Sequence, residues 1–140
     1  MADVALAFSS RGAANGLVLD LSREGISSAI TATCHELAAL PLEGLEAVVI
    51  DSAFVKAALE EKEPDPVRRL VGRRAGGASS PRVIVVMTRP LSQVRSVELQ
   101  RAIANADLVL DAPASTDDVV LAVRTQRTFG SPILHGGRGS

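Results

Sequence analysis

Four short runs of apolar, mostly β-branched residues constrain the fold of this 140-residue chain most strongly. Within each run no polar residue interrupts the apolar ones, so a strand formed there would be apolar on both faces. Strands of that kind are typical of parallel sheets that are covered on both sides. The runs are residues 4–8, 47–50, 83–87 and 108–110. A weaker run at residues 26–33 predicts a strand at the edge of the sheet.

Helical patterns fill the gaps between these runs. They cover residues 12–24, 34–40, 54–63, 67–71 and 91–105, and a last helix begins after Ser115 or Thr116. Gly25 is a C-terminal stop for the first helix, and Asp65 before Pro66 is typical of a helix start. The alternation of strands and helices predicts an α/β fold with a doubly wound, five-stranded parallel sheet in the flavodoxin-like order 2-1-3-4-5.

The chain length suits one domain, which we place at residues 1–128. The Gly-rich residues 129–140 are predicted to be a flexible tail or linker, and the Gly-, Arg- and Ser-rich residues 72–80 a flexible loop. That loop is not a P-loop, because it lacks the Lys-Ser/Thr pair and a preceding strand.

Composition excludes several classes of function. A net charge of −1 with no Trp or Tyr offers no electrostatic or stacking surface for nucleic acid. The four arginines at positions 68, 69, 73 and 74 are read as a solvated helix face. A single cysteine, Cys34, excludes an intrachain disulfide and a zinc site built from thiolate pairs. The apolar runs are too short to span a membrane, so cytoplasm is the expected location, and no cofactor or metal is expected.

Chemistry in such a sheet is expected where the strands end, because ligands bind outside the carboxyl ends of the strands. The residues that follow the predicted strands are Ser9, Ser10, Asp51, Ser52, Thr88, Arg89, Asp111, Ala112 and Pro113. His35 and His135 are far apart in the sequence, so neither a metal site nor a base for a serine nucleophile is predicted.

The order of these motifs resembles the receiver domains of bacterial two-component systems. Residues 48–51 resemble the third strand, which ends in the phosphoacceptor aspartate, and residues 85–88 resemble the fourth, which ends in the switch Ser/Thr. Residues 112–119 resemble the Lys-Pro turn and the acidic start of the last helix. The resemblance covers residues 3–127 and implies a phosphoacceptor at Asp51, a switch residue at Thr88 and a cis peptide before Pro113.

The chain departs from the receiver pattern where the phosphorylation chemistry lies. Ser9 and Ser10 stand where receivers carry acidic magnesium ligands, and Ala112 stands in place of the lysine. Val109 takes the place of the aromatic switch residue. Magnesium and a cation normally neutralise the charge that develops in phosphoryl transfer, so these losses predict very slow transfer. Arg89 is proposed as a fixed cation beside Asp51 that replaces the metal.

The leading hypothesis is therefore a pseudo-receiver, a signalling module that binds a protein partner or itself and is not an enzyme. The resemblance implies an interface on the face formed by the fourth helix, fifth strand and last helix. Its residues would be Leu91, Val94, Arg95, Glu98, Arg101, Ala106, Asp107, Asp118, Leu121, Ala122 and Arg124. Two alternatives stay open: a phosphorylated receiver with Asp51 as the site, and a sensor of a small anion or nucleotide held at Ser9–Ser10.

Overall fold

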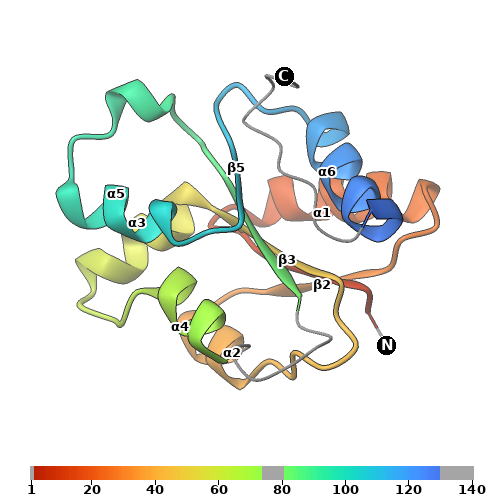
Figure 1. Ribbon diagram of the computed structural model, residues 1–140, viewed down its shortest axis with the longest axis horizontal. Helices are drawn as coiled ribbons and strands as arrows, with labels where there is room; N and C mark the ends of the chain where they lie inside the picture. Colours follow the sequence, from red (N-terminus) through yellow and green to blue (C-terminus); the bar gives the residue numbers. More distant parts are fainter. Residues whose placement is uncertain (1, 74–80, 130–140) are drawn as a thin grey trace.

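The predicted sheet is present in the computed structural model of the chain, which describes residues 2–73 and 81–129 (Figure 1). Its five strands are all parallel and lie in the order β2-β1-β3-β4-β5, which confirms the predicted architecture. The strands are β1 (Val4–Ala7), β2 (Ser28–Thr31), β3 (Ala47–Asp51), β4 (Arg82–Val86) and β5 (Leu108–Leu110). The weak run forms the edge strand β2, as predicted.

Helices cover both faces of this sheet. In Figure 1, α1 and α6 lie together on one face, and α2, α3, α4 and α5 lie on the other. The helices are α1 (Arg11–Arg23), α2 (Cys34–Ala39), α3 (Ser52–Glu60), α4 (Pro66–Arg73), α5 (Val97–Ala104) and α6 (Thr116–Phe129), with a short 3-10 helix, η1 (Leu91–Gln93). No helix within the described residues is long and apolar enough to cross a membrane.

The two covered faces explain why the strand sequences are apolar without interruption. In β3, Val48 and Ile50 pack under α2 to α5, whereas Val49 packs under α1 and α6. All three side chains are fully buried. A polar residue at any of these positions would lose its hydration in one of the two cores. The strand therefore cannot alternate between apolar and polar residues.

The predicted helix ends are confirmed where the sequence carries a specific signal. Gly25 has a φ of +77°, and its N–H donates to the carbonyl of Ser22 at 3.0 Å, while Ile26 N–H donates to the carbonyl of Leu21 at 2.9 Å. This pair of bonds closes the end of α1 in the conformation that glycine adopts most easily. Asp65 accepts from Val67 N–H at 2.9 Å and so caps α4.

One predicted helix is wrong, because residues 91–105 do not form a continuous helix. They divide into η1 and α5, with Val94 extended between them. The hydroxyl of Ser96 accepts from Leu99 N–H at 3.2 Å, which starts a new helix at Val97. Two smaller differences concern α3, which begins at Ser52 and not at residue 54, and α4, which continues to Arg73. Residues 74–80 of the predicted loop and 130–140 of the predicted tail lie outside the described residues.

Two glycine substitutions should change stability in opposite directions. A Cβ added at Gly16, in the middle of α1, meets no described atom within 4 Å, so Gly16→Ala should raise the free energy of unfolding. Gly25→Ala should lower it, because Gly25 has a φ of +77°. Each change should amount to about 1 kcal/mol in chemical denaturation. Shifts of the same sign in the two variants would contradict the assigned end of α1.

Candidate functional site

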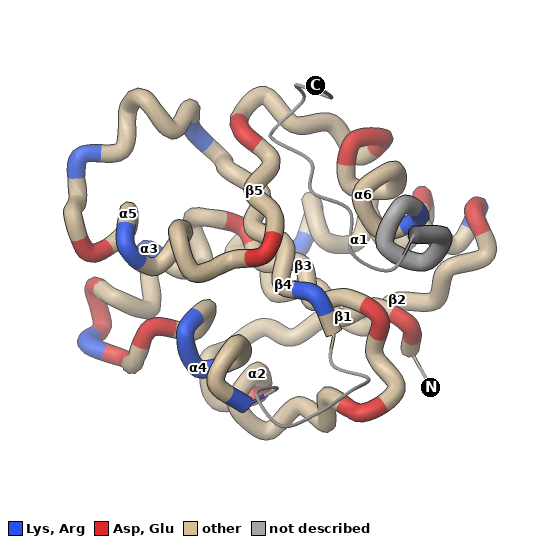
Figure 2. The backbone as a smooth tube through the Cα atoms, viewed as in Figure 1, with Lys and Arg blue, Asp and Glu red and all other residues tan. Residues whose placement is uncertain are grey.

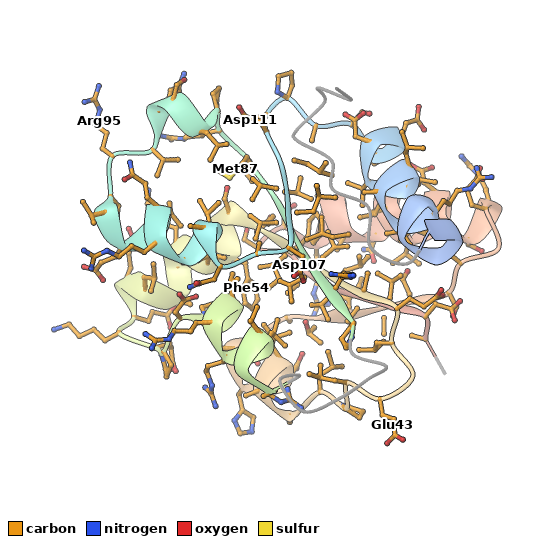
Figure 3. The ribbon with its side chains drawn as sticks, in the orientation of Figure 1. Glu43, Phe54, Met87, Arg95, Asp107 and Asp111 are labelled. Atoms are coloured by element: carbon orange, nitrogen blue, oxygen red, sulfur yellow. The ribbon has the colours of Figure 1, made fainter. Side chains whose placement is uncertain are left out.

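The carboxyl ends of the central strands bring two pairs of polar side chains together. Ser9 follows β1 and meets Asp51, the last residue of β3. Ser52, the first residue of α3, meets Thr88, which lies just beyond β4. These four residues occupy the edge of the sheet where the sequence predicts the site. Figure 3 shows Asp111 at the same edge, beyond Met87.

Asp51 serves as the N-cap of α3. One oxygen of its carboxylate, Oδ1, accepts from Phe54 N–H at 2.7 Å. Ser9 N–H lies 3.3 Å from both carboxylate oxygens, and the Ser9 hydroxyl donates to Oδ2 at 3.3 Å. Only 3% of the Asp51 surface is exposed. Because α3 starts immediately after β3, the carboxylate is turned back onto the helix end and faces the chain's own donors.

Burial dominates the electrostatics of this carboxylate. Loss of hydration raises the pKa of Asp51, and the hydrogen bonds from Phe54 and Ser9 oppose that rise without cancelling it. Within the described part of the chain, no ion pair involves Asp51. The surroundings of Asp51 therefore supply neutral donors, which suit a structural cap better than a site that accumulates negative charge.

Ser52 and Thr88 form a second, separate contact. Thr88 N–H donates to the Ser52 hydroxyl at 2.8 Å, and the two hydroxyl oxygens lie 3.0 Å apart. Ser52 is buried whereas Thr88 is exposed. The polar groups of Thr88 are therefore directed to the start of α3, and this pairing was not predicted from the sequence.

Comparison with known proteins identifies the fold. No protein-family model and no curated protein matches the chain. Among solved structures, a Francisella response-regulator receiver domain matches with a TM-score of 0.64 and 20% identity, over 91% of this chain and 99% of that one. A receiver domain protein from Methanospirillum hungatei matches with a TM-score of 0.61 and 17% identity, over 90% of this chain and 94% of that one.

A third match is a Burkholderia pseudomallei response regulator with a phosphorylated aspartic acid and a calcium ion. It matches with a TM-score of 0.57 and 15% identity, over 94% of this chain and 76% of that one. The chain has the receiver fold. At these identities the likeness concerns the fold, and the chemistry has to be judged from the residues of this chain.

A receiver fold implies a magnesium ion beside the phosphoacceptor, and the residues here do not fit one. Magnesium requires several hard oxygen ligands at short, near-octahedral positions. Among the four residues brought together here, Asp51 alone carries a carboxylate, and its oxygens already accept from Ser9 and Phe54. Among the residues that the structure describes, no three His, Cys, Asp or Glu side chains form a group able to hold a metal ion.

The proposed role of Arg89 is not supported by the structure. Arg89 is exposed, no ion pair in the described chain joins it to Asp51, and it is not among the groups that shift the pKa of Asp51. The residue follows Thr88 in the bend before Pro90. Within the described residues, no contact therefore supports the hypothesis that a built-in cation replaces the metal.

The remaining predicted site residues have structural contacts. Ser10 accepts from Ala13 N–H at 3.3 Å and caps α1, so its hydroxyl is not directed to Asp51. Val109 and Ala112 are half-buried against the core under α2 to α5. The peptide bond before Pro113 is cis, as the resemblance implies.

Asp111 makes contacts that the sequence did not assign. Its Oδ1 accepts from Leu91 N–H and from Ala112 N–H, each at 2.8 Å. These bonds connect the end of β5 to η1. A carboxylate that follows a strand and precedes a turn is a signal for such a cap, but its partner, 20 residues away in the sequence, cannot be identified without the fold.

Proposed function

We propose that the chain is a pseudo-receiver, a protein-interaction module that works without a phosphorylation cycle. The observation that carries the proposal is the state of Asp51. A phosphoacceptor must present a carboxylate oxygen to the phosphoryl donor, in line with the bond that breaks. Here the carboxylate is 3% exposed and is held by one side-chain and two backbone donors.

Charge stabilisation around Asp51 supports the same proposal. Transfer to a carboxylate develops negative charge on the phosphoryl oxygens, and each missing stabiliser in a comparable oxyanion site costs about 3–4 kcal/mol of the barrier. Ala112 occupies the position of the receiver lysine, and Ser9 and Ser10 occupy the positions of the acidic ligands. A phosphorylated receiver at Asp51 is thus the weaker alternative.

The surface at the β5 edge is the part of the fold that we propose to bind a protein. It combines η1, α5 and the outer side of α6, and Figure 2 shows mostly basic residues, with an acidic residue among them, along the segment from β4 to α5. Figure 3 shows Arg95 projecting into solvent from this segment. Exposed Arg95 and Arg101 lie near exposed Glu98, so the surface carries both signs of charge, as a two-fold contact between copies requires.

Apolar residues on the same surface strengthen the proposal. Leu91 is 40% exposed, and Val97, which the sequence did not single out, is 57% exposed at the start of α5. Exposed Leu121 and Asp118 extend the surface onto α6, although Asp118 also caps that helix by accepting from Ser115 N–H at 2.9 Å.

Several residues proposed for the interface are placed elsewhere. Arg124 pairs with Glu24, just after the end of α1, at 2.8 Å, so its charge is already compensated within the chain. Ala122 is buried in the core under α1 and α6. Val94 and Ala106 are half-buried against the other core, and Asp107 accepts from Val83 N–H at 2.8 Å.

Sedimentation velocity with a phosphodonor tests this proposal. We expect concentration-dependent dimerisation that acetyl phosphate and Mg²⁺ leave unchanged, with no phosphoryl mass added to the intact protein. Val97→Asp should weaken dimerisation at least tenfold, because it places charge in the apolar centre of the contact and is well tolerated at a helix start. Leu19→Asp on α1 is the matched control, since Leu19 is 61% exposed and α1 does not contribute to the proposed surface.

Two results would count against the pseudo-receiver. A phosphoryl mass gain coupled to a change in association would restore a working switch at Asp51. A protein that stays monomeric at every concentration, or that responds to Leu19→Asp and Val97→Asp alike, would contradict the proposed dimer at the β5 edge.

A further inference from the structure

A cavity of about 360 Å³ opens beside the candidate site, between α3 and the start of α2. It lies outside the carboxyl ends of β1 and β2, where Ser9 and Thr33 belong to its lining. Cavities that bind small ligands in open α/β sheets are found at this edge and have volumes of about 300–1,000 Å³. Neither the cap at Asp51 nor the β5-edge surface accounts for this cavity.

The wall that α3 contributes is apolar. Phe54, Ala57 and Ala58 line it at successive turns of the helix. Phe54 and Ala58 are buried, whereas Ala57 is exposed at the mouth. A ligand that enters the cavity therefore meets a flat hydrocarbon surface on one side, which favours an apolar ligand body.

The rim at the end of α3 is acidic. Glu61 and Glu63 both line the cavity, and neither forms an ion pair within the described residues. Their charge acts inside the cavity: the pKa of the Cys34 thiol is raised first by burial and then by Glu63 and Glu61. Arg69 acts in the opposite direction on Cys34 and lines a neighbouring shallow groove and not this cavity.

We propose that this cavity binds a small organic cation, a protonated amine or guanidinium carried on an apolar body. The carboxylates of Glu61 and Glu63 would hold the charged group at the rim, the apolar wall of α3 would cover the body, and hydroxyls of Ser9 and Thr33 would accept hydrogen bonds. An anion would be repelled by the two carboxylates, and a neutral polar ligand would lack the charge–charge attraction that a cation gains from them. His35 also lines the cavity, but the two carboxylates outnumber it, so the lining favours a cationic ligand over an anionic one.

Ser9 lines the cavity and also donates a hydrogen bond to Asp51, the cap of α3. A ligand in the cavity would therefore contact a residue that itself contacts this cap. This inference does not depend on the pseudo-receiver proposal, since a phosphorylated Asp51 would leave Glu61 and Glu63 unchanged. Failure of either proposal can thus be recognised separately.

Titration of the ¹⁵N-labelled full chain by NMR with benzylamine, benzyl alcohol and benzoate tests the cavity. We expect saturable shifts with benzylamine at the amides of Thr33, Cys34 and Ala57, and weak or no shifts with the other two probes. Acetyl-arginine amide is the second cationic probe. Tighter binding of benzylamine would indicate a free amine as the ligand, and tighter binding of the arginine derivative a basic side chain of a partner.

Three variants make the result decisive. Glu61→Gln with Glu63→Gln should weaken benzylamine binding by roughly tenfold, whereas Glu60→Gln, an exposed acid on α3 outside the cavity, should not. Ala57→Leu should abolish binding by filling the mouth while keeping a good helix former. Equal binding of benzoate, equal affinity in the double glutamine variant, or the absence of shifts at these amides would overturn the proposal.

Discussion

Asp51→Ala is expected to lower the free energy of unfolding by about 2–4 kcal/mol, because it removes a helix cap and leaves buried donors without an acceptor. Phe54 N–H and Ser9 N–H both donate to this carboxylate. A stability loss of this size is unusual for a substitution at the edge of a sheet, and it follows from the burial of Asp51. Urea unfolding at neutral pH measures it.

Asp51→Asn is the matched control, because it keeps one acceptor and removes the charge. At neutral pH it should cost less than alanine. Burial raises the pKa of Asp51, so the part of its contribution that depends on protonation is fully present below the unfolded pKa of about 3.9 and is lost as pH rises through the folded pKa, whereas the cap hydrogen bonds remain. Asp51→Asn should not show this loss of stability with rising pH, because asparagine does not titrate. A change within about 0.5 kcal/mol for Asp51→Ala would contradict the structural role of the cap.

Ser9→Asp combined with Ser10→Asp should produce a protein whose stability depends on magnesium. The Ser9 hydroxyl lies 3.3 Å from Oδ2 of Asp51, so an aspartate there would place a second carboxylate against the first. Without metal, repulsion between like charges should lower the midpoint of thermal unfolding. Mg²⁺ at ten times its dissociation constant should restore about 1.4 kcal/mol, because it binds only the folded chain.

The single variant Ser10→Asp separates the metal effect from the helix cap. Ser10 caps α1, and aspartate is an equally good cap, so this variant should stay as stable as the wild type and should not respond to Mg²⁺. If the wild type itself gained stability from millimolar Mg²⁺, the site would hold the metal without acidic residues at positions 9 and 10. The conclusion that the residues around Asp51 do not fit magnesium would then be wrong.

The strands and their order could be predicted because burial on both faces leaves a plain signal in the sequence. The run at residues 47–50 is apolar since Val48 and Val49 face different cores. Gly25 was equally informative, because a φ of +77° at the end of a helix strongly favours glycine. Signals of this kind depend on one residue and its immediate neighbours.

The contacts of the candidate site could not be predicted in the same way. Ser9 and Asp51 are 42 residues apart in the sequence, and their hydrogen bonds depend on the turn from β3 into α3. The prediction that Arg89 lies beside Asp51 is not supported by an ion pair among the described residues, because position at a strand end fixes the edge of the sheet but not the direction of a side chain. The division of residues 91–105 was missed because the cap signal of Ser96 lies inside a continuous helical pattern.

The most direct test of the account is the titration of the Asp51 side-chain carboxyl carbon, followed by NMR with and without millimolar Mg²⁺. We expect a midpoint above the ordinary aspartate value of about 3.9, because burial outweighs the hydrogen bonds from Phe54 and Ser9, and we expect that Mg²⁺ does not move it. A midpoint at or below that value, shifted further down by Mg²⁺, would contradict it. Such a result would describe an exposed, metal-binding phosphoacceptor instead of a buried cap.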